Sequence, residues 1–185
     1  MEKRIGFGPR LGAYLIDIVF IWILSSLVSR IVPTLFAAGA QQQIGSILSS
    51  NPMVANIYTG DMLTLLESIV RISLVCTVVE AVYYLTEIFF GASLGKMLLK
   101  LKIVDVEGQS ASIGLLVGRY LLKHISTMCT LVAFFCIPLL FNSLGSLLGF
   151  VIFIGCFFAA GDKHQALHDL MCRTIVVRKN ASEEN

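Results

Sequence analysis

Charged residues are scarce in this chain of 185 residues. Only 14% of the sequence is Asp, Glu, Lys or Arg, whereas soluble domains average about 25%. The net charge is only +2, and no run of basic residues alternates with aromatic residues, so we expect no binding of nucleic acid. Hydrophobic residues instead make up 56%, with a mean hydropathy of +0.83. This composition is typical of integral membrane proteins, whose first partner is the lipid bilayer.

The motifs of common enzymes and cofactor sites are also missing. The cysteines are odd in number, include no Cys-x-x-Cys pair and mostly lie in apolar runs, so neither a disulfide framework nor a zinc site is predicted. No Gly-x-Ser-x-Gly elbow is present, and GASLGK (91–96) lacks the full spacing of a phosphate-binding loop. We therefore predict no enzymatic activity and no cofactor.

A polar group in the tail is the candidate for a metal site. His164 and His168 are four residues apart, at metal-ligand spacing on one helix face, and lie close to Asp162 and Asp169. A third clear ligand is missing, so no metal is predicted, and packing at the surface is the preferred interpretation. Asp162, followed three residues later by Gln165, fits a capping box that opens a short helix.

Long apolar runs dominate the chain, and about 20 such residues cross a bilayer. The first run is too long for a signal-peptide core and contains an aspartate, so it is interpreted as an uncleaved anchor. Pro138 and NSLG (142–145) divide the longest run and predict a tight hairpin. We predict an all-α polytopic membrane protein, a four-helix transmembrane bundle in a single domain of residues 1–185. The helices are expected at 11–32, 69–90, 115–139 and 144–160.

The segments on one side of these helices combine basic and β-branched residues. Residues 91–114 include leucines punctuated by Lys96, Lys100 and Lys102, which predicts a short amphipathic interfacial helix whose lysines contact anionic lipid headgroups. KIVDV in this segment and TIVVRK in the tail (161–185) are candidates for two short cytoplasmic strands that pair with each other.

Basic residues favour one side of the membrane. Four crossings place both termini on the same side and make residues 33–68 an external loop, with helical parts expected around 44–48 and 62–66. Twelve of the fourteen Lys and Arg residues fall on the side of the termini, and only Arg30 and Arg71 fall on the other. The positive-inside rule therefore places both termini in the cytoplasm.

Two of the predicted helices carry polar stripes. Arg10, Tyr14 and Asp17 share one face of the first, and Asp17 lies roughly 10 Å deeper than Arg10. The second carries Glu80 near mid-membrane and Glu87 about one turn from its end, with tyrosines between them. A charge at mid-bilayer costs about 2.5–3.5 kcal/mol, so the two stripes should face each other rather than lipid.

Two interpretations of these acids stay open. They can hold the bundle together by pairing with Arg119, Lys123 or tyrosine hydroxyls, which implies no further function. Alternatively, one of Asp17, Glu80 and Glu87 is desolvated and binds a cation or cycles a proton. Glu87 lies near enough to a helix end to reach the headgroups, which favours the first interpretation for that residue.

Three stretches carry a resemblance to a known family. PRLGAYLIDIVF (9–20) has Arg10 at the start of the first helix and Asp17 within it. SLGKMLLKLKIVDVEG (93–108) follows the second helix, and HQALHDLMCRTIVV (164–177) closes the chain. Together they resemble the RDD family of bacterial and archaeal membrane proteins, named for one arginine and two aspartates.

The resemblance implies several expectations. Asp169 is our choice for the second aspartate, with Asp162 as the alternative. Lys100 stands where a small residue is expected, and Cys172-Arg173 replaces small residues before the final threonine, so the match is weaker there. The family implies a location in the cytoplasmic membrane and a role in transport of unidentified ligands, with cation/proton antiport proposed for some members.

Three functions follow in order of support. The first is a transporter or transporter subunit that uses the intramembrane carboxylates for cation/proton exchange, as a homodimer because four helices enclose little volume. The alternative is a non-transporting scaffold or assembly factor whose basic cytoplasmic surface binds anionic lipid or a soluble partner. An intramembrane enzyme has the least support, because no nucleophile has a nearby base within the helices.

Overall fold

The structure is a computed structural model that describes residues 4–50, 60–135, 138–162 and 164–178, and most of these residues are helical. In chain order the elements are α1 (Phe7–Ile31), α2 (Ala37–Ser50), α4 (Gly60–Phe90), α5 (Leu94–Leu98), β1 (Leu101–Asp105), α6 (Ile113–Lys123), α7 (Ile125–Phe135), α8 (Pro138–Cys156), the 3₁₀-helix η1 (Phe157–Ala160), α9 (Leu167–Met171) and β2 (Thr174–Arg178).

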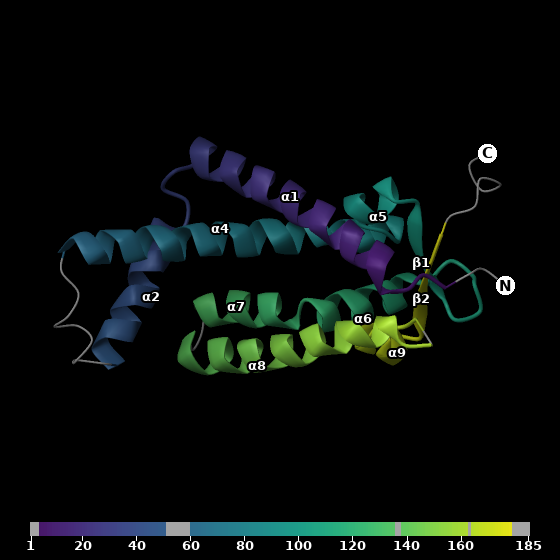
Figure 1. Ribbon diagram of the computed structural model, residues 1–185. Helices are drawn as coiled ribbons and strands as arrows, with labels where there is room; N and C mark the ends of the chain where they lie inside the picture. Colours follow the sequence, from purple (N-terminus) through teal and green to yellow (C-terminus); the bar gives the residue numbers. More distant parts are fainter. Residues whose placement is uncertain (1–3, 51–59, 136–137, 163, 179–185) are drawn as a thin grey trace.

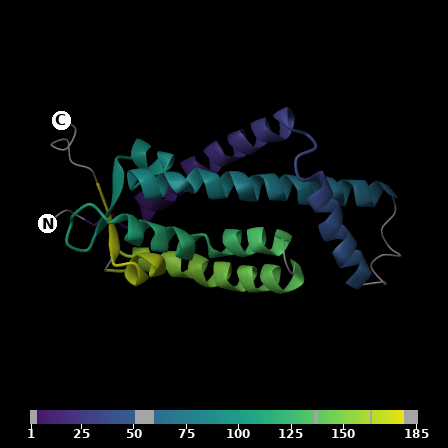
Figure 2. The ribbon, with the colours of Figure 1, turned by 180° about the vertical axis from the view of Figure 1, so that it is seen from behind.

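The helices form two layers (Figure 1). α1 packs on α4 in one layer, α7 packs on α8 in the other, and α4 joins the layers through contacts with α6 and α7. α5, α9 and the two strands gather at one end of the molecule, near the first described residues, whereas α2 lies toward the other end (Figures 1 and 2). We call the former the strand end. It brings the start, the middle and the last part of the described chain together.

The two predicted strands exist and pair. β1 and β2 are antiparallel, in a register that runs from Leu101 opposite Arg178 to Asp105 opposite Thr174. The backbone N–H of Ile5 donates to the carbonyl of Val176 at 2.9 Å, which fixes the chain before α1 against the sheet. The pairing of KIVDV with TIVVRK is thereby confirmed, and it positions the loops that surround the polar residues described below.

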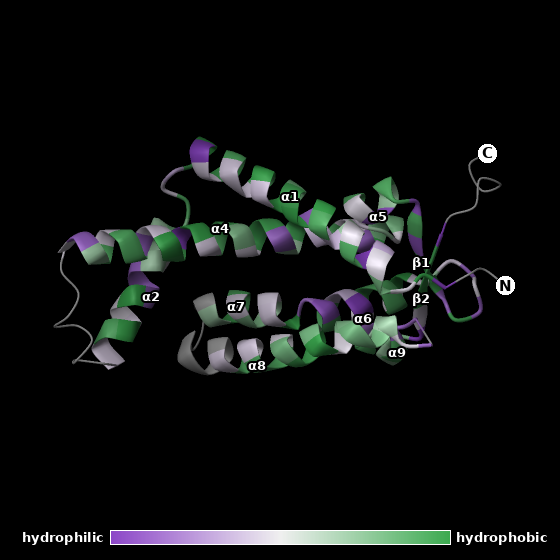
Figure 3. Ribbon diagram, viewed as in Figure 1, coloured by the Kyte–Doolittle hydropathy of each residue, from purple (hydrophilic) through white to green (hydrophobic). Residues whose placement is uncertain are grey.

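The exterior of the helical part is apolar. Trp22 on α1, Val82 on α4 and Phe153 on α8 each expose 60% or more of their surface. Figure 3 shows hydrophobic residues along all three helices and strongly hydrophilic residues on α6. In the described part of the chain, three helical stretches are long and apolar enough to cross a membrane: 7–31, 60–90 and 143–160. Buried charges inside an apolar exterior are the pattern of a membrane protein.

The predicted boundaries on the first half need correction. α1 begins at Phe7 rather than at residue 11, and α4 begins at Gly60 rather than at residue 69. The prediction of a loop over 33–68 was wrong for α2 and for the first turns of α4, although helical parts around 44–48 and 62–66 were expected. Ala and Gln are good helix formers, and AAGAQQQ therefore continues as a helix despite its glycine.

The helix predicted over 115–139 is broken. α6 ends at Lys123 and α7 starts at Ile125, while His124 between them has φ −105° and ψ 27°. The break turns a continuous apolar run into two short helices. Polar side chains at the break lie in the interior, as shown below, and hydropathy alone does not record which way they point.

The turn predicted at NSLG (142–145) was also wrong, because this segment lies inside α8. α8 starts at Pro138, a residue that suits the first position of a helix because its missing N–H has no intrahelical partner there. The glycine of NSLG serves packing instead: a Cβ on Gly145 would lie 2.7 Å from the Cβ of Cys129 on α7. Small residues let membrane helices approach closely, so this glycine indicates a helix contact rather than a turn.

Candidate functional site

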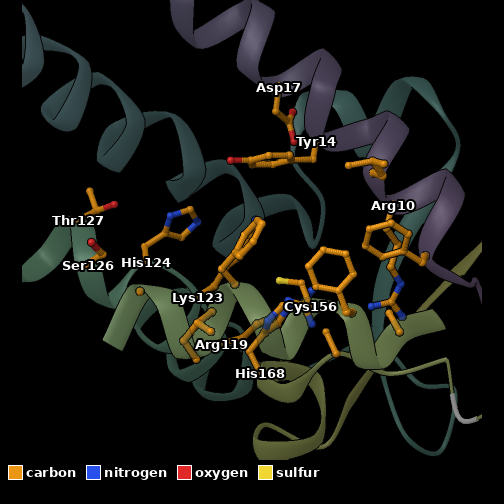
Figure 4. A pocket seen from close by; sticks show the side chains of 18 of the residues that line it. Arg10, Tyr14, Asp17, Arg119, Lys123, His124, Ser126, Thr127, Cys156 and His168 are labelled. Atoms are coloured by element: carbon orange, nitrogen blue, oxygen red, sulfur yellow. The ribbon is translucent and has the colours of Figure 1, made fainter. Parts of the chain in front are cut away.

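A cavity of about 690 Å³ lies between the two helical layers. Two arginines, two lysines, two carboxylates and two histidines contribute to its lining, together with apolar side chains of α1 and α8. Figure 4 shows Asp17 and Tyr14 on one side, and Arg119, Lys123 and His168 on the opposite side. The charged and histidine residues of the lining are Arg10, Asp17, Glu80, Lys96, Arg119, Lys123, His124 and His168.

The first group of charges is centred on Asp169 of α9, which is completely buried. Its carboxylate forms ion pairs with Arg10 of α1 and Arg119 of α6. Arg10 also donates to the carbonyls of Ile5 at 3.0 Å and His164 at 2.8 Å. We call this the Asp169 cluster. It connects the start of the chain, the middle and the tail through one buried carboxylate.

The second group is centred on Glu87 of α4, which is 2% exposed. Oε1 of Glu87 lies 2.6 Å from Nζ of Lys96 and 3.0 Å from Nζ of Lys123. The latter ammonium also lies 4.1 Å from the centre of the Tyr84 ring, a cation–π contact. We call this the Glu87 cluster, in which one carboxylate again holds two cations.

The Glu87 cluster corrects two predictions. Glu87 does not reach the headgroups, and Lys96 is 6% exposed, so Lys96 does not contact lipid as predicted from the amphipathic pattern. Burial lowers the pKa of the Lys96 ammonium, while the nearby Glu87 carboxylate favours its charged form. Lys100 is exposed and Lys102 half-buried, so for these residues a lipid contact stays a prediction.

Asp17 pairs with neutral groups, although it is 1% exposed. Its carboxylate accepts the hydroxyls of Tyr83 and Ser93, both at 2.6 Å, and the backbone N–H of Gly95 at 2.7 Å. The polar stripes of α1 and α4 do meet here, through Tyr83 rather than Glu80. Asp17 therefore ties α5 to both long helices, and three donors satisfy its charge without a cation.

Glu80 is held more loosely than the other carboxylates of the lining. Its side chain is 37% exposed, and its one partner among the described residues is Nδ1 of His124, at 3.4 Å. His124 sits at the break between α6 and α7 and is 5% exposed. A second, smaller pocket of about 190 Å³ shares Tyr14 and Glu80 with the large cavity. Glu80 thus stands where two hollow regions meet.

The tail residues are arranged differently from the prediction. Asp162 is exposed, and the short helix opens at Leu167, so the capping box of Asp162 and Gln165 was wrong. Nδ1 of His164 lies 3.4 Å from the carbonyl of Ala159, and Nε2 of His168 lies 3.4 Å from Asp169. No group of three or more metal-binding side chains occurs within the part of the chain that the structure describes.

Comparison with known proteins identifies the family of this chain. The model of the RDD family matches residues 4–173. The chain belongs to the RDD family. It is 30% identical over 182 residues to the "Uncharacterized protein YxaI" of Bacillus subtilis (strain 168), a match that covers 97% of this chain and 100% of that protein. No solved structure matches the chain. The resemblance read from the three motifs is thereby confirmed.

Membership of the RDD family gives a context for residues that sequence reasoning missed. Ser93 and Gly95 bind Asp17, and Thr174 accepts a hydrogen bond from Arg119 at 3.1 Å. All three residues lie in the second and third motifs, so the motifs were the available signal. Spacing could not assign them, because each partner lies more than 50 residues away in sequence.

A buried histidine predicts a pH dependence of stability. Burial lowers the pKa of His168 well below its usual range, with the nearby Arg119 acting in the same direction. Below about pH 6.5 the unfolded chain takes up a proton that the folded protein excludes. The free energy of unfolding therefore decreases as the pH is lowered, by up to about 1.4 kcal/mol per pH unit. We expect His168→Gln to flatten this dependence in thermal unfolding between pH 7.5 and 5. The half-buried His164, changed to Gln, is the control, and equal slopes for both variants would contradict the prediction.

Proposed function

We propose that this RDD protein is a transporter, or a transporter subunit, that moves an unidentified small solute together with a proton. The observation that carries the proposal is a cavity with charged lining inside an apolar exterior, with one loosely held carboxylate, Glu80, in its wall. Ionisable residues in membrane helices are costly, and those that face a cavity are candidates for an ion or proton pathway.

The proposal includes four crossings with both termini in the cytoplasm. The broken pair α6 and α7 would form the additional crossing beside the three long helical stretches. Support comes from the strand end, which carries exposed basic residues such as Arg4, Arg173 and Arg178, whereas Arg30 stands in the last turn of α1, away from that end. The homodimer expected from the sequence belongs to the same proposal, because a second copy would extend the path.

The carboxylates of the site divide by their partners. Asp169 and Glu87 each contact two cations, and Asp17 accepts three hydrogen bonds, so a proton on any of them would break strong interactions. Among the described residues Glu80 pairs with His124 alone, and a histidine can itself take or release a proton. Glu80 is therefore the residue best suited to exchange a proton with the cavity.

Substitution of Glu80 tests this role. Glu80→Gln keeps the size of the side chain and removes the proton exchange, so we expect pH-coupled flux to fall by about ten-fold or more, as for the loss of an acid–base group. The measurement is a pH-sensitive dye inside proteoliposomes, under imposed gradients of sodium, potassium, chloride or phosphate. Glu67→Gln is the control, because Glu67 lies on the same helix, bonds Gln41 at 3.2 Å and is outside the cavity lining.

Two outcomes would count against transport. One is a wild-type protein that changes the internal pH under none of these gradients. The other is a Glu80→Gln protein whose flux equals that of the wild type and of Glu67→Gln.

The scaffold function has one observation in its favour. Lys100, Arg173 and Arg178 are all exposed at the strand end, where a basic surface can bind anionic lipid or an acidic partner. This function predicts that crosslinks from the strand end capture a partner protein in cells. Recovery of only this chain would argue against it.

A further inference from the structure

The lining of the cavity has an excess of positive groups. Arg10, Lys96, Arg119 and Lys123 line it, whereas their carboxylate partners, Asp169 and Glu87, are not part of the lining. Each carboxylate pairs with two cations, so each cluster has a net charge of +1. Asp17, which contacts Gly95 beside Lys96, adds one negative charge.

The four cations are balanced only while Glu80, which lines the same cavity, is ionised. Protonation of Glu80 leaves one positive charge uncompensated in this part of the interior. Glu80, the next carboxylate, is paired with His124 rather than with either cluster. An uncompensated charge in a low-dielectric interior is costly, and a bound anion would remove that cost.

An unpartnered donor points to the same place. Nε of Arg119 forms no hydrogen bond to any described residue, although Arg119 is only 2% exposed. Buried polar atoms nearly always have a partner, and Arg119 lines the cavity. Figure 4 shows Arg119, Lys123 and His168 together on one side of it. Nε of a guanidinium only donates, so the partner that it lacks is an acceptor.

We propose that the cavity binds an anionic group, a phosphate or a carboxylate, between the Lys123 ammonium and Nε of Arg119. The group belongs either to a soluble anion or to the headgroup of an anionic lipid. This inference names the substrate class of the proposed transporter. Only the movement of the anion across the membrane rests on the proposed function, because the binding of the anion is argued from the cavity alone. The inference replaces the cation of a cation/proton exchange by an anion that moves with the proton.

Coupling to the proton follows from electrostatics. A bound anion repels a second negative charge in the same cavity, which favours the protonated form of Glu80. Release of the anion removes this repulsion and favours release of the proton. Anion and proton would then travel together, with no net charge moved for a monovalent anion.

Lys123→Gln is the test variant, because it removes one cation and leaves Glu87 paired with Lys96 at 2.6 Å. The probes are inorganic phosphate, titrated calorimetrically into purified protein in zwitterionic detergent, and nanodiscs of phosphatidylglycerol and phosphatidylcholine, from which retained lipid is identified by native mass spectrometry. We expect binding to weaken by about ten-fold, the loss of one charge-assisted contact. Lys123→Arg should restore binding, and Arg30→Gln, which removes an exposed charge in the last turn of α1 and outside the cavity lining, should change it by less than about two-fold.

The results of these experiments distinguish a soluble anion from a lipid headgroup. Phosphate binding that depends on Lys123 identifies a soluble anion, and selective retention of phosphatidylglycerol that depends on Lys123 identifies a lipid headgroup. Absence of both, or binding that Lys123→Gln and Arg30→Gln weaken equally, overturns the inference. Glu80→Gln should still bind the anion, so a loss of flux in that variant with intact binding bears on transport alone.

Discussion

Replacing Asp169 with Asn is expected to destabilise the folded protein by about 3–5 kcal/mol, the cost of breaking a buried ion pair from one side. Asn keeps the shape of the side chain but leaves Arg10 and Arg119 without their shared carboxylate. Arg119 is only 2% exposed, so its charge stays largely desolvated when the carboxylate is lost. Whole domains are stable by about 5–15 kcal/mol, so most of the protein should be lost on purification or unfold at a much lower temperature.

The matched control is Asp162→Asn. Asp162 is the other candidate for the second aspartate of the RDD motif, lies seven residues earlier in the same tail and is exposed, so its loss should change stability by less than about 0.5 kcal/mol. Thermal unfolding of both variants in detergent is the measurement. Adding Arg119→Met to Asp169→Asn should recover part of the loss, because it removes one unpaired charge. Equal stabilities of the two aspartate variants would show that the Asp169 cluster is dispensable.

The sequence was sufficient for features that depend on local composition. Apolar runs located α1, α4 and α8, and β-branched residues located both strands. The sequence was insufficient where the same residue pattern occurs in two different environments. A lysine between leucines has the same pattern whether it faces a headgroup, as predicted for Lys96, or a buried carboxylate such as Glu87, where it lies. The predicted helix boundary near residue 144 was wrong for a related reason. Gly145 was interpreted as part of a turn, whereas in the structure it allows close contact between two helices.

The site was predictable as a set of residues but not as a set of contacts. Arg10, Asp17 and Asp169 were singled out by pattern and by the RDD motifs. Their partners come from distant parts of the chain: Arg10 and Asp169 are 159 residues apart, and Tyr83 and Asp17 are 66 apart. No helical or strand period relates such positions. The polar stripes alone did not distinguish Asp17 from Glu80, whereas the structure does: Asp17 accepts three hydrogen bonds, and Glu80 is 37% exposed beside His124.

Replacing Gly95 with Ala is the second change for which a large loss is expected. A Cβ at this position would lie 2.2 Å from the carbonyl oxygen of Ala13 and 2.7 Å from Oδ1 of Asp17. Neither atom can yield easily, because one is helix backbone and the other belongs to a carboxylate whose two oxygens are held by Tyr83 and Ser93. α5 would have to move away from α1 and give up its hydrogen bond to Asp17.

Overpacking costs about 1–3 kcal/mol and an unsatisfied buried polar group a similar amount, so Gly95→Ala should lower stability by about 3 kcal/mol or more. Gly114→Ala is the control, since Gly114 lies in α6 with no atom within 4 Å of an added Cβ. Alanine is favoured over glycine in a helix by up to about 1 kcal/mol, so the control should be neutral or stabilised. In the same thermal unfolding measurement, Gly95→Ala should therefore lower the stability, whereas Gly114→Ala should not. A Gly95→Ala protein as stable as the control would mean that α5 is not seated on Asp17 as the structure places it.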